Sequence, residues 1–235
     1  MKNRMTRKKV KFALILFLLC LTVTPIIAQD WVGTDRYKAD NEKIGTALPN
    51  ETRIVFMGNS IAEGWSKICP GFFQGKSYIN RGISGQTTPQ MLARFRADVI
   101  NLKPSIVIIL AGTNDIAENN DPSTPEMILN NIISMAELAK YNGIKVILCS
   151  VLPALDYYWR PGLKPVEKIA RLNRVIKKYA AETGCGYIDY YSSMADEQKG
   201  LKKELTSDGI HPNETGYKIM APLTEDAIQK ALNIK

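Results

Sequence analysis

The 235-residue chain contains a single histidine, His211, and a carboxylate, Asp208, stands three residues before it. Histidine is the side chain whose ordinary titration falls near neutral pH, so imidazole acid–base chemistry in this chain depends on one position. The segment Asp208-Gly-Ile-His-Pro-Asn213 is typical of a loop leading into a helix, a common setting for catalytic groups. A lone histidine often has no chemical role, so the question becomes whether a nucleophile accompanies it.

Two serines are candidates for that nucleophile. Ser60 follows Gly58-Asn59 at the end of an apolar run, on a turn that is expected to open a helix, and taken alone it is typical of a helix-capping serine. Ser84 lies in Gly82-Ile-Ser-Gly-Gln86, which approaches a nucleophile elbow, but glutamine stands where that pattern needs its second glycine. Ser60 is therefore the stronger candidate.

The elements that must position these residues alternate between short β-branched runs and longer amphipathic runs. This alternation predicts a parallel sheet covered by helices. The strands expected are 53–57, 77–80, 106–110, 145–151 and 186–189. The helices expected after Ser60 are 89–102, 125–141, 165–182 and 213–232, with Pro222 kinking or interrupting the last. Ligands bind beyond the carboxyl ends of the strands in such sheets, so the site is expected in the loops that follow them.

Two of these loops offer hydrogen-bond donors. The loop after the second strand contains Gly82 and Gly85, where backbone N–H groups can approach a ligand. The third strand ends in Gly112-Thr-Asn-Asp115, which places a side-chain amide, that of Asn114, beside a glycine. Each loop alone could also be a plain turn.

The loop after the fourth strand is rich in aromatic residues, with Tyr158 and Trp159 at its centre. Aromatic side chains with polar tips can stack on a sugar ring or flank an acyl pocket. Trp159 could equally serve only to pin the loop to the body of the protein. We assign Trp159 and Tyr158 to substrate binding, together with Arg81 from the second loop.

Taken in order, the motifs around Ser60, Gly82, Asn114 and His211 resemble those of the SGNH hydrolases, also called the GDSL esterase/lipase family. The resemblance extends from Arg53 to Leu223. It implies a serine esterase with a three-layer α/β/α fold, built on a five-stranded parallel flavodoxin-like sheet in the order 2-1-3-4-5. It implies no cofactor and no metal.

The resemblance also implies a role for each residue. Ser60 would be the nucleophile, His211 the general base and then acid, and Asp208 the carboxylate that orients the ring. The N–H groups of Ser60 and Gly82 and the side-chain amide of Asn114 would form the oxyanion hole.

One residue departs from the family pattern, which usually reads Gly-Asp-Ser where this chain has Asn59. Asparagine keeps the shape and one acceptor oxygen, so local hydrogen bonds can persist, but the negative charge near Ser60 is lost. We interpret this as a tolerated variant. The alternative is an esterase fold that no longer reacts and only binds carbohydrate.

The first 28 residues have the pattern of a secretory signal peptide, with a basic start, an apolar run at 12–23 and a small residue, Ala28, at the expected cleavage site. The apolar run is too short for a spanning helix, so no stable membrane insertion is expected after cleavage. Cleavage would leave one domain, residues 29–235, in the periplasm or the medium.

Removal of this leader takes the formal charge from +8 to +2, because it carries six basic residues and no acidic ones. The high isoelectric point therefore does not indicate a nucleic-acid partner. Three cysteines remain. Cys149 is expected in a buried strand, and a bridge between Cys69 and Cys185 is one option.

The forms Asn80-Arg-Gly-Ile-Ser-Gly85 and Asp208-Gly-Ile-His-Pro-Asn213 are similar to those of the platelet-activating-factor acetylhydrolase-like branch, which favours short acyl groups. Together with the predicted secretion, this indicates a serine esterase that removes O-acetyl groups from glycans or small-molecule esters. A lysophospholipase or thioesterase with longer acyl chains is the alternative.

Overall fold

The computed structural model describes residues 30–233, and residues from Val32 onward form one compact unit. The predicted signal peptide and its cleavage site lie outside the described residues. None of the helices in this part of the chain is both long and apolar enough to cross a membrane. Cys69, Cys149 and Cys185 are all free, so the optional bridge between Cys69 and Cys185 is not formed.

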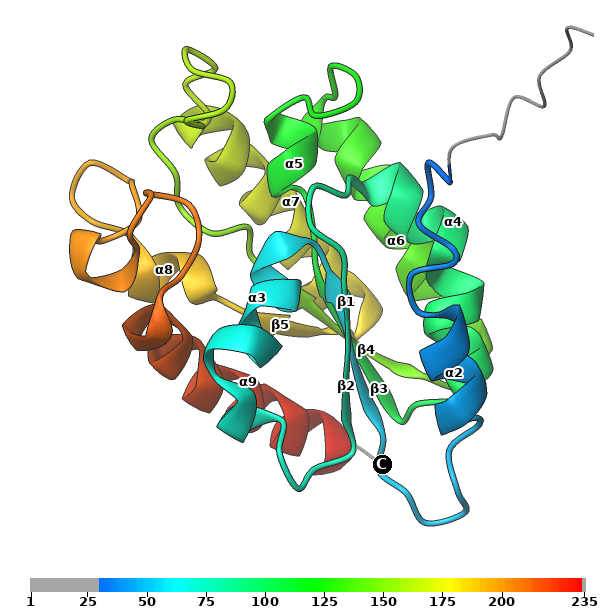
Figure 1. The fold of residues 1–235 in the computed structure, drawn as a ribbon. Helices are drawn as coiled ribbons and strands as arrows, with labels where there is room; N and C mark the ends of the chain where they lie inside the picture. The colour runs from blue at the N-terminus through cyan, green and yellow to red at the C-terminus, as the bar shows by residue number, and fades with distance from the viewer. Residues whose placement is uncertain (1–29, 234–235) are drawn as a thin grey trace, which may run out of the picture. The chain divides into compact units, whose positions relative to one another are not determined.

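Five short runs rich in β-branched residues form one parallel sheet (Figure 1). The strand order is β2-β1-β3-β4-β5, which confirms the predicted fold class. The strands are β1 (Ile54–Gly58), β2 (Tyr78–Gly82), β3 (Ile106–Leu110), β4 (Lys145–Cys149) and β5 (Gly186–Ile188). The fourth strand ends two residues before its predicted end, and the others lie within two residues of theirs.

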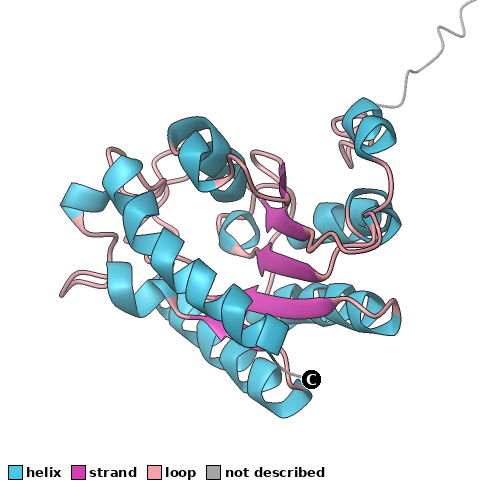
Figure 2. Ribbon diagram, turned by 90° about the horizontal axis from the view of Figure 1, so that it is seen from below, coloured by secondary structure: helices cyan, strands magenta, loops and turns pink. Residues whose placement is uncertain are grey.

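Helices connect the strands and cover both faces of the sheet (Figure 2). The predicted helix at 125–141 is found with the same bounds, because Thr124 caps its first turn and Asn142 ends it. The helices are α2 (Lys38–Ile44), α3 (Ser60–Ile68), α4 (Thr88–Asp98), α5 (Thr113–Ile116), α6 (Pro125–Tyr141), α7 (Val166–Thr183), α8 (Tyr190–Met194) and α9 (Glu214–Asn233). Single 3-10 turns lie at Pro70–Phe72, Ile100–Leu102 and Lys203–Leu205.

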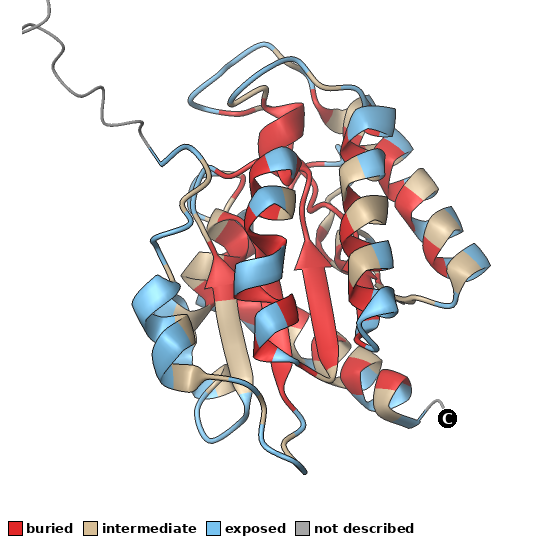
Figure 3. Ribbon diagram, turned by 90° about the vertical axis from the view of Figure 1, so that its right-hand side faces the viewer, coloured by how far each residue is buried: buried red, intermediate tan, exposed pale blue. Residues whose placement is uncertain are grey.

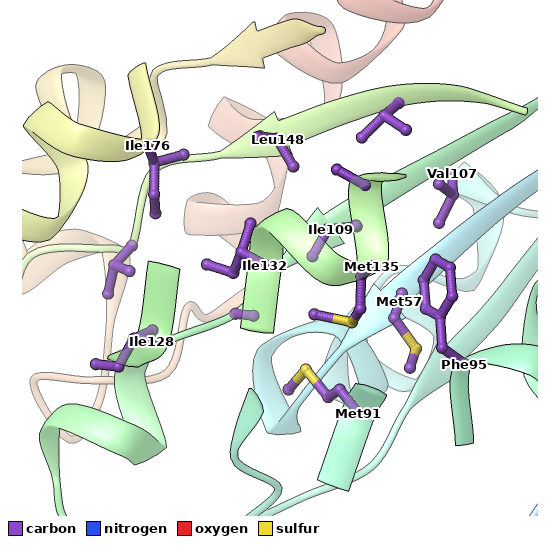
Figure 4. Packing of buried hydrophobic residues seen from close by; sticks show 14 of the residues in the cluster. Met57, Met91, Phe95, Val107, Ile109, Ile128, Ile132, Met135, Leu148 and Ile176 are labelled. Carbon is purple, nitrogen blue, oxygen red and sulfur yellow. The ribbon is translucent and has the colours of Figure 1, made fainter. Parts of the chain in front are cut away.

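Alternate residues of each strand point to opposite faces, so the sheet separates two apolar clusters. Helices α4, α6 and α7 pack on one face, where Met57, Ile109 and Leu148 meet Phe95 and Met135 (Figure 4). Helices α3, α8 and α9 pack on the other face. Figure 3 shows buried strand segments between helices whose outer sides are exposed, and the edge strand β2 is only partly buried.

Helix α9 continues through Pro222, contrary to the interruption that the sequence allows. A proline inside a helix removes one backbone hydrogen bond, which leaves a carbonyl one turn earlier without its partner. Pro222 lies on the exposed side of α9, where water can satisfy that carbonyl.

Three strands end at the same level of the sheet. Gly58 at the end of β1 lies opposite Gly82 in β2 and Leu110 in β3. The loops that follow these residues therefore meet at one edge, the edge where ligands bind in open parallel sheets. The backbone arrangement alone thus brings together the predicted loops that follow β1, β2 and β3.

Candidate active site

Ser60 is the first residue of α3, directly after the turn that leaves β1. The N-cap of this helix is Asn59, whose Oδ1 accepts the N–H of Ile61 at 3.0 Å. The expectation that Ser60 caps the helix is therefore wrong, because Asn59 already occupies that position. The acceptor oxygen of Asn59 thus makes a local hydrogen bond, as expected for asparagine at this position, and the hydroxyl of Ser60 is left for other contacts.

Ser60, His211 and Asp208 form a hydrogen-bonded series. The Oγ of Ser60 lies 2.9 Å from Nε2 of His211, and Nδ1 of the same ring lies 2.7 Å from Oδ2 of Asp208. The side chains of His211 and Asp208 are each 30% exposed, so a substrate can reach the ring while one side of it is held. Ser84, the rival serine, lies at an exposed position of the second loop, whereas both ring nitrogens of His211 contact Ser60 and Asp208.

The loop 206–212 fixes the carboxylate of Asp208. Its Oδ1 accepts the backbone N–H groups of Ile210 and His211, at 2.9 and 2.8 Å. The hydroxyl of Thr206 closes the loop by donating to the carbonyl of His211 at 2.7 Å. The backbone thus holds Oδ1 of Asp208 and leaves Oδ2 for the imidazole of His211.

Burial alone would raise the pKa of Asp208, but hydrogen bonds from the His211 backbone and ring and from the Ile210 N–H outweigh it, and the pKa lies below its ordinary value. The carboxylate is therefore ionised at neutral pH and accepts a hydrogen bond from Nδ1 of His211. With the proton on Nδ1, Nε2 is the acceptor that faces the hydroxyl of Ser60.

Asn114 lies in the short helix α5, immediately beyond β3, and is 2% exposed. Its Nδ2 donates to the carbonyl of Gln86 at 3.0 Å, which ties α5 to the loop after β2. An amide nitrogen carries two hydrogens, so this contact orients the group while using one of them.

The structure corrects the assignment of Gly82 to the oxyanion hole. The N–H of Gly82 donates to Oδ1 of Asn80 at 2.8 Å, so it is already paired. Gly82 instead serves close packing, because a Cβ there would lie 2.2 Å from the backbone nitrogen of Glu63 and 2.7 Å from the carbonyl of Asn59.

Gly85 is the glycine of the same loop whose N–H has no acceptor among residues 30–233. Its neighbours Ile83, Ser84 and Gln86 donate their N–H groups to Gly58, Glu63 and Ile83. The backbone N–H of Ser60, at the start of α3, likewise has no acceptor in the described part of the chain. The sequence analysis noted Gly85 but assigned Gly82 to the oxyanion hole. The sequence does not show that the N–H of Gly82 is paired with Asn80, because this hydrogen bond depends on the path of the backbone.

The assignment of Arg81 to substrate binding is also corrected. Arg81 is 2% exposed and points away from the loops that carry Ser60 and His211, toward α2. Its guanidinium lies 2.7 Å from a carboxylate oxygen of Asp40 and donates to Oδ1 of Asn41 at 2.9 Å. Side chains alternate along a strand, so Arg81 is directed away from its neighbour Asn80, which contacts α3.

Trp159 lies beside the catalytic candidates. Its ring centroid is 6.4 Å from that of His211, with an angle of 32° between the planes, and its Nε1 donates to Oδ1 of Asn119 at 2.9 Å. Tyr158 packs edge-on against Trp159 and is 66% exposed. The two aromatic residues therefore form an accessible surface next to the imidazole.

A family model described as the GDSL-like lipase/acylhydrolase family matches residues 56–219, a segment that contains Ser60, Asn114 and the His211 loop. The chain belongs to this family. The predicted membership is thereby confirmed.

Relatives of this GDSL acylhydrolase include esterases. The crystal structure of a GDSL-like lipase from Bacteroides thetaiotaomicron is 48% identical, with a TM-score of 0.83, and the match covers 85% of this chain and 98% of that one. Esterase TesA from Pseudomonas aeruginosa is 26% identical over 66% of this chain and 73% of its own length. An acetylxylan esterase from Xylanibacter ruminicola is 28% identical over 75% of this chain and 43% of its own length, so this chain spans less than half of that relative.

Beneath the active-site edge of the acylhydrolase lies a buried cation that the sequence analysis missed. The guanidinium of Arg94 in α4 is fully buried and pairs with Asp98 at 2.8 Å. It also donates to the carbonyls of Gly58 and Arg81 and, at 2.6 Å, to Oε1 of Gln86. Arg94 thus links the ends of β1 and β2 to the loop that contacts Asn114.

A second missed group is the carboxylate of Asp115, which is 1% exposed. It accepts the N–H and the hydroxyl of Thr88 and so fixes the first turn of α4 to α5. Burial raises the pKa of Asp115 above its ordinary value, although the bonds from Thr88 oppose this. The four-residue spacing of Arg94 and Asp98 on one helix indicates an ion pair that the sequence could have revealed. The burial of these residues and of Asp115 depends on tertiary packing.

Proposed function

We propose that this acylhydrolase is a secreted serine esterase that hydrolyses short-chain acyl esters, chiefly O-acetyl groups on carbohydrates, through an acyl-enzyme on Ser60. The observation that carries the proposal is the series Ser60, His211 and Asp208, with successive separations of 2.9 and 2.7 Å at an accessible edge. A serine hydroxyl becomes an effective nucleophile when a positioned base accepts its proton.

In the proposed acylation step, Oγ of Ser60 attacks the ester carbonyl while its proton passes to Nε2 of His211. The ionised Asp208 stabilises the imidazolium that forms. Collapse of the tetrahedral intermediate breaks the bond to the alcohol, which receives the proton from His211. Water then attacks the acyl-enzyme by the same route in reverse, with His211 again acting as base, and releases the acid and free Ser60.

The negative charge on the carbonyl oxygen is stabilised by three donors in this proposal. These are the N–H of Ser60, the N–H of Gly85 in place of the Gly82 first expected, and the second hydrogen on Nδ2 of Asn114. Two observations support the choice of Gly85: its N–H has no acceptor in the part of the chain that the structure describes, and the next residue, Gln86, contacts Asn114. Donors fixed before the reaction need no rearrangement as charge develops.

The proposed carbohydrate substrate is supported by the aromatic surface beside His211. Trp159 is held in place through Asn119, and a fixed aromatic face suits the flat apolar side of a sugar ring. Acetylxylan esterases from Xylanibacter ruminicola and Geobacillus stearothermophilus are among the relatives. Secretion is proposed on the predicted cleavage after Ala28, and sequencing of exported protein should begin at Gln29.

A chain-length series tests the proposed acyl specificity. We expect the specificity constant to fall from p-nitrophenyl acetate to p-nitrophenyl octanoate, and acetylated xylo-oligosaccharides to release acetate. Equal or faster turnover of the octanoyl ester would contradict the acetylesterase proposal and favour a lysophospholipase or thioesterase. Folded protein that binds the oligosaccharide but hydrolyses no ester would instead indicate a carbohydrate-binding role.

A further inference from the structure

Residues 32–44, here called the N-terminal strap, precede the segment 56–219 that matches the family and comprise a turn followed by α2. Helix α2 lies beside α4, as Figure 1 shows. The loop after β2, residues 83–87, is here called the oxyanion loop. We propose that the N-terminal strap positions the oxyanion loop, and through it Gly85 and Asn114, for ester hydrolysis.

The strap holds the side chain of Gln86 from one side. Nε2 of Gln86 donates to the carbonyl of Val32 at 2.5 Å, and Oε1 accepts from Arg94 at 2.6 Å. Because both ends of this buried amide are fixed, the backbone of Gln86 is fixed as well, and its carbonyl accepts from Asn114. Gln86 thus connects the strap, through its side chain, to the side chain of Asn114, through its backbone carbonyl.

Two further contacts bind the strap to the same region. The hydroxyl of Tyr37 donates to the carbonyl of Gly82, the residue just before the oxyanion loop, at 2.5 Å. Arg36 pairs with Glu63 at 3.1 Å, and the other carboxylate oxygen of Glu63 accepts the N–H of Ser84 at 2.8 Å. The strap therefore contacts Gln86 within the loop and Gly82 just before it directly, and it reaches Ser84 through the side chain of Glu63.

Arg81 anchors the strap to the sheet. Its guanidinium lies 4.6 Å from the ring centroid of Tyr37 and pairs with Asp40 in α2. Asn41 extends the connection by donating to a carboxylate oxygen of Asp98 at 2.6 Å, the same carboxylate that binds Arg94. The buried arginine that sequence reasoning placed in the substrate site instead joins the strap to the network beneath that site.

Two glycines of the strap region permit a matched test. Gly33 has φ +71°, and a Cβ there would lie 3.0 Å from Nε2 of Gln86 and 3.3 Å from Cδ1 of Ile83. Gly45 has φ +61°, and a Cβ there meets nothing within 4 Å. Alanine strains the backbone at either position, because both residues have a positive φ, but only at Gly33 would the added Cβ push against the oxyanion loop.

The experiment compares full-length Gly33→Ala and Gly45→Ala with the wild type. For p-nitrophenyl acetate we expect kcat to fall at least about tenfold in Gly33→Ala with KM within about twofold, because oxyanion donors act mainly in the transition state. The Gly45→Ala protein should keep kcat within about twofold. Hydrogen–deuterium exchange of residues 83–86 should accelerate only in Gly33→Ala.

The exchange measurement separates this inference from the proposed function on which its kinetic part rests. Faster exchange confined to Gly33→Ala in a protein that hydrolyses no ester would support the strap and refute the esterase. Equal exchange and equal kcat in the two variants would overturn the role of the strap. If Gly33→Ala does not fold, Tyr37→Phe replaces it, because this change removes only the hydrogen bond from the hydroxyl to Gly82. An unchanged kcat and an unchanged exchange rate in Tyr37→Phe would likewise overturn the inference.

Discussion

The Oγ of Ser60 lies 2.9 Å from Nε2 of His211, although 151 positions of sequence separate the two residues. Ser60 opens α3 after the first strand, and His211 precedes α9, so the packing of these two helices on one face of the sheet brings the residues together. Neither residue would be functional alone, because a serine without a base is a weak nucleophile. This contact predicts that Ser60, His211 and the carboxylate that orients His211 matter most for activity.

Asp208→Asn should lower kcat for p-nitrophenyl acetate by about 10² to 10⁴-fold, with little change in KM. The asparagine amide can donate toward Nδ1 of His211 and so favour the tautomer that carries its proton on Nε2. Steady-state kinetics measure the effect, and Asp226→Asn, which removes a surface carboxylate paired with Lys230, serves as the control. Similar kinetics for both variants would show that Asp208 does not orient the imidazole.

Asp208 should also make folding stability depend on pH. Its pKa is lower in the folded protein than the ordinary value of 3.8, so the ionised carboxylate stabilises the fold above that pH, and the stabilisation is lost as the pH falls through the folded pKa. The difference in melting temperature between wild type and Asp208→Asn should be largest above about pH 5 and shrink below about pH 3.8. A difference that grows on acidification would contradict this sign.

Gly82→Ala should destabilise the protein by about 2 kcal/mol or more, because its Cβ would overlap the backbone of α3. Gly71→Ala is the matched control, since a Cβ there meets nothing within 4 Å. Chemical denaturation measures both free energies of unfolding. Equal stability of the two variants would mean that Gly82 does not pack against α3 as described.

Trp159→Ala should raise KM for acetylated xylo-oligosaccharides by about 2 to 10-fold, the effect of losing one aromatic contact. The specificity constant for p-nitrophenyl acetate should change less, because that substrate has no sugar ring. Tyr141→Ala, at a residue 92% exposed and outside the site, controls for loss of surface aromatic area. An equal loss on both substrates would assign Trp159 to the support of His211 instead.

The sheet and the positions of Ser60, Asn114 and His211 were predictable because they depend on local patterns. Apolar runs mark strands, and in a parallel sheet their carboxyl ends must meet at one edge. The interruption that Pro222 allowed does not occur, because the carbonyl that the proline leaves unpaired lies on the exposed side of α9, which packing decides.

The roles of Arg81, Gly82 and Arg94 were not predictable, because each depends on contacts between segments distant in sequence. A basic residue in a loop motif is normally expected to be accessible, yet Arg81 is buried by α2. The N–H of Gly82 is paired with Asn80 and that of Gly85 has no acceptor among the described residues, a difference that the backbone path decides. Arg94 is buried because three carbonyl or amide oxygens and Asp98 surround it.

The most direct test of the account is active-site labelling with a fluorophosphonate probe, followed by peptide mapping. We predict that the wild type is labelled on Ser60, that Ser84→Ala is labelled equally, and that Ser60→Ala is unlabelled and loses at least about a thousandfold in kcat. Labelling of Ser84, or near wild-type hydrolysis by a folded Ser60→Ala protein, would contradict the assignment of Ser60 as the nucleophile.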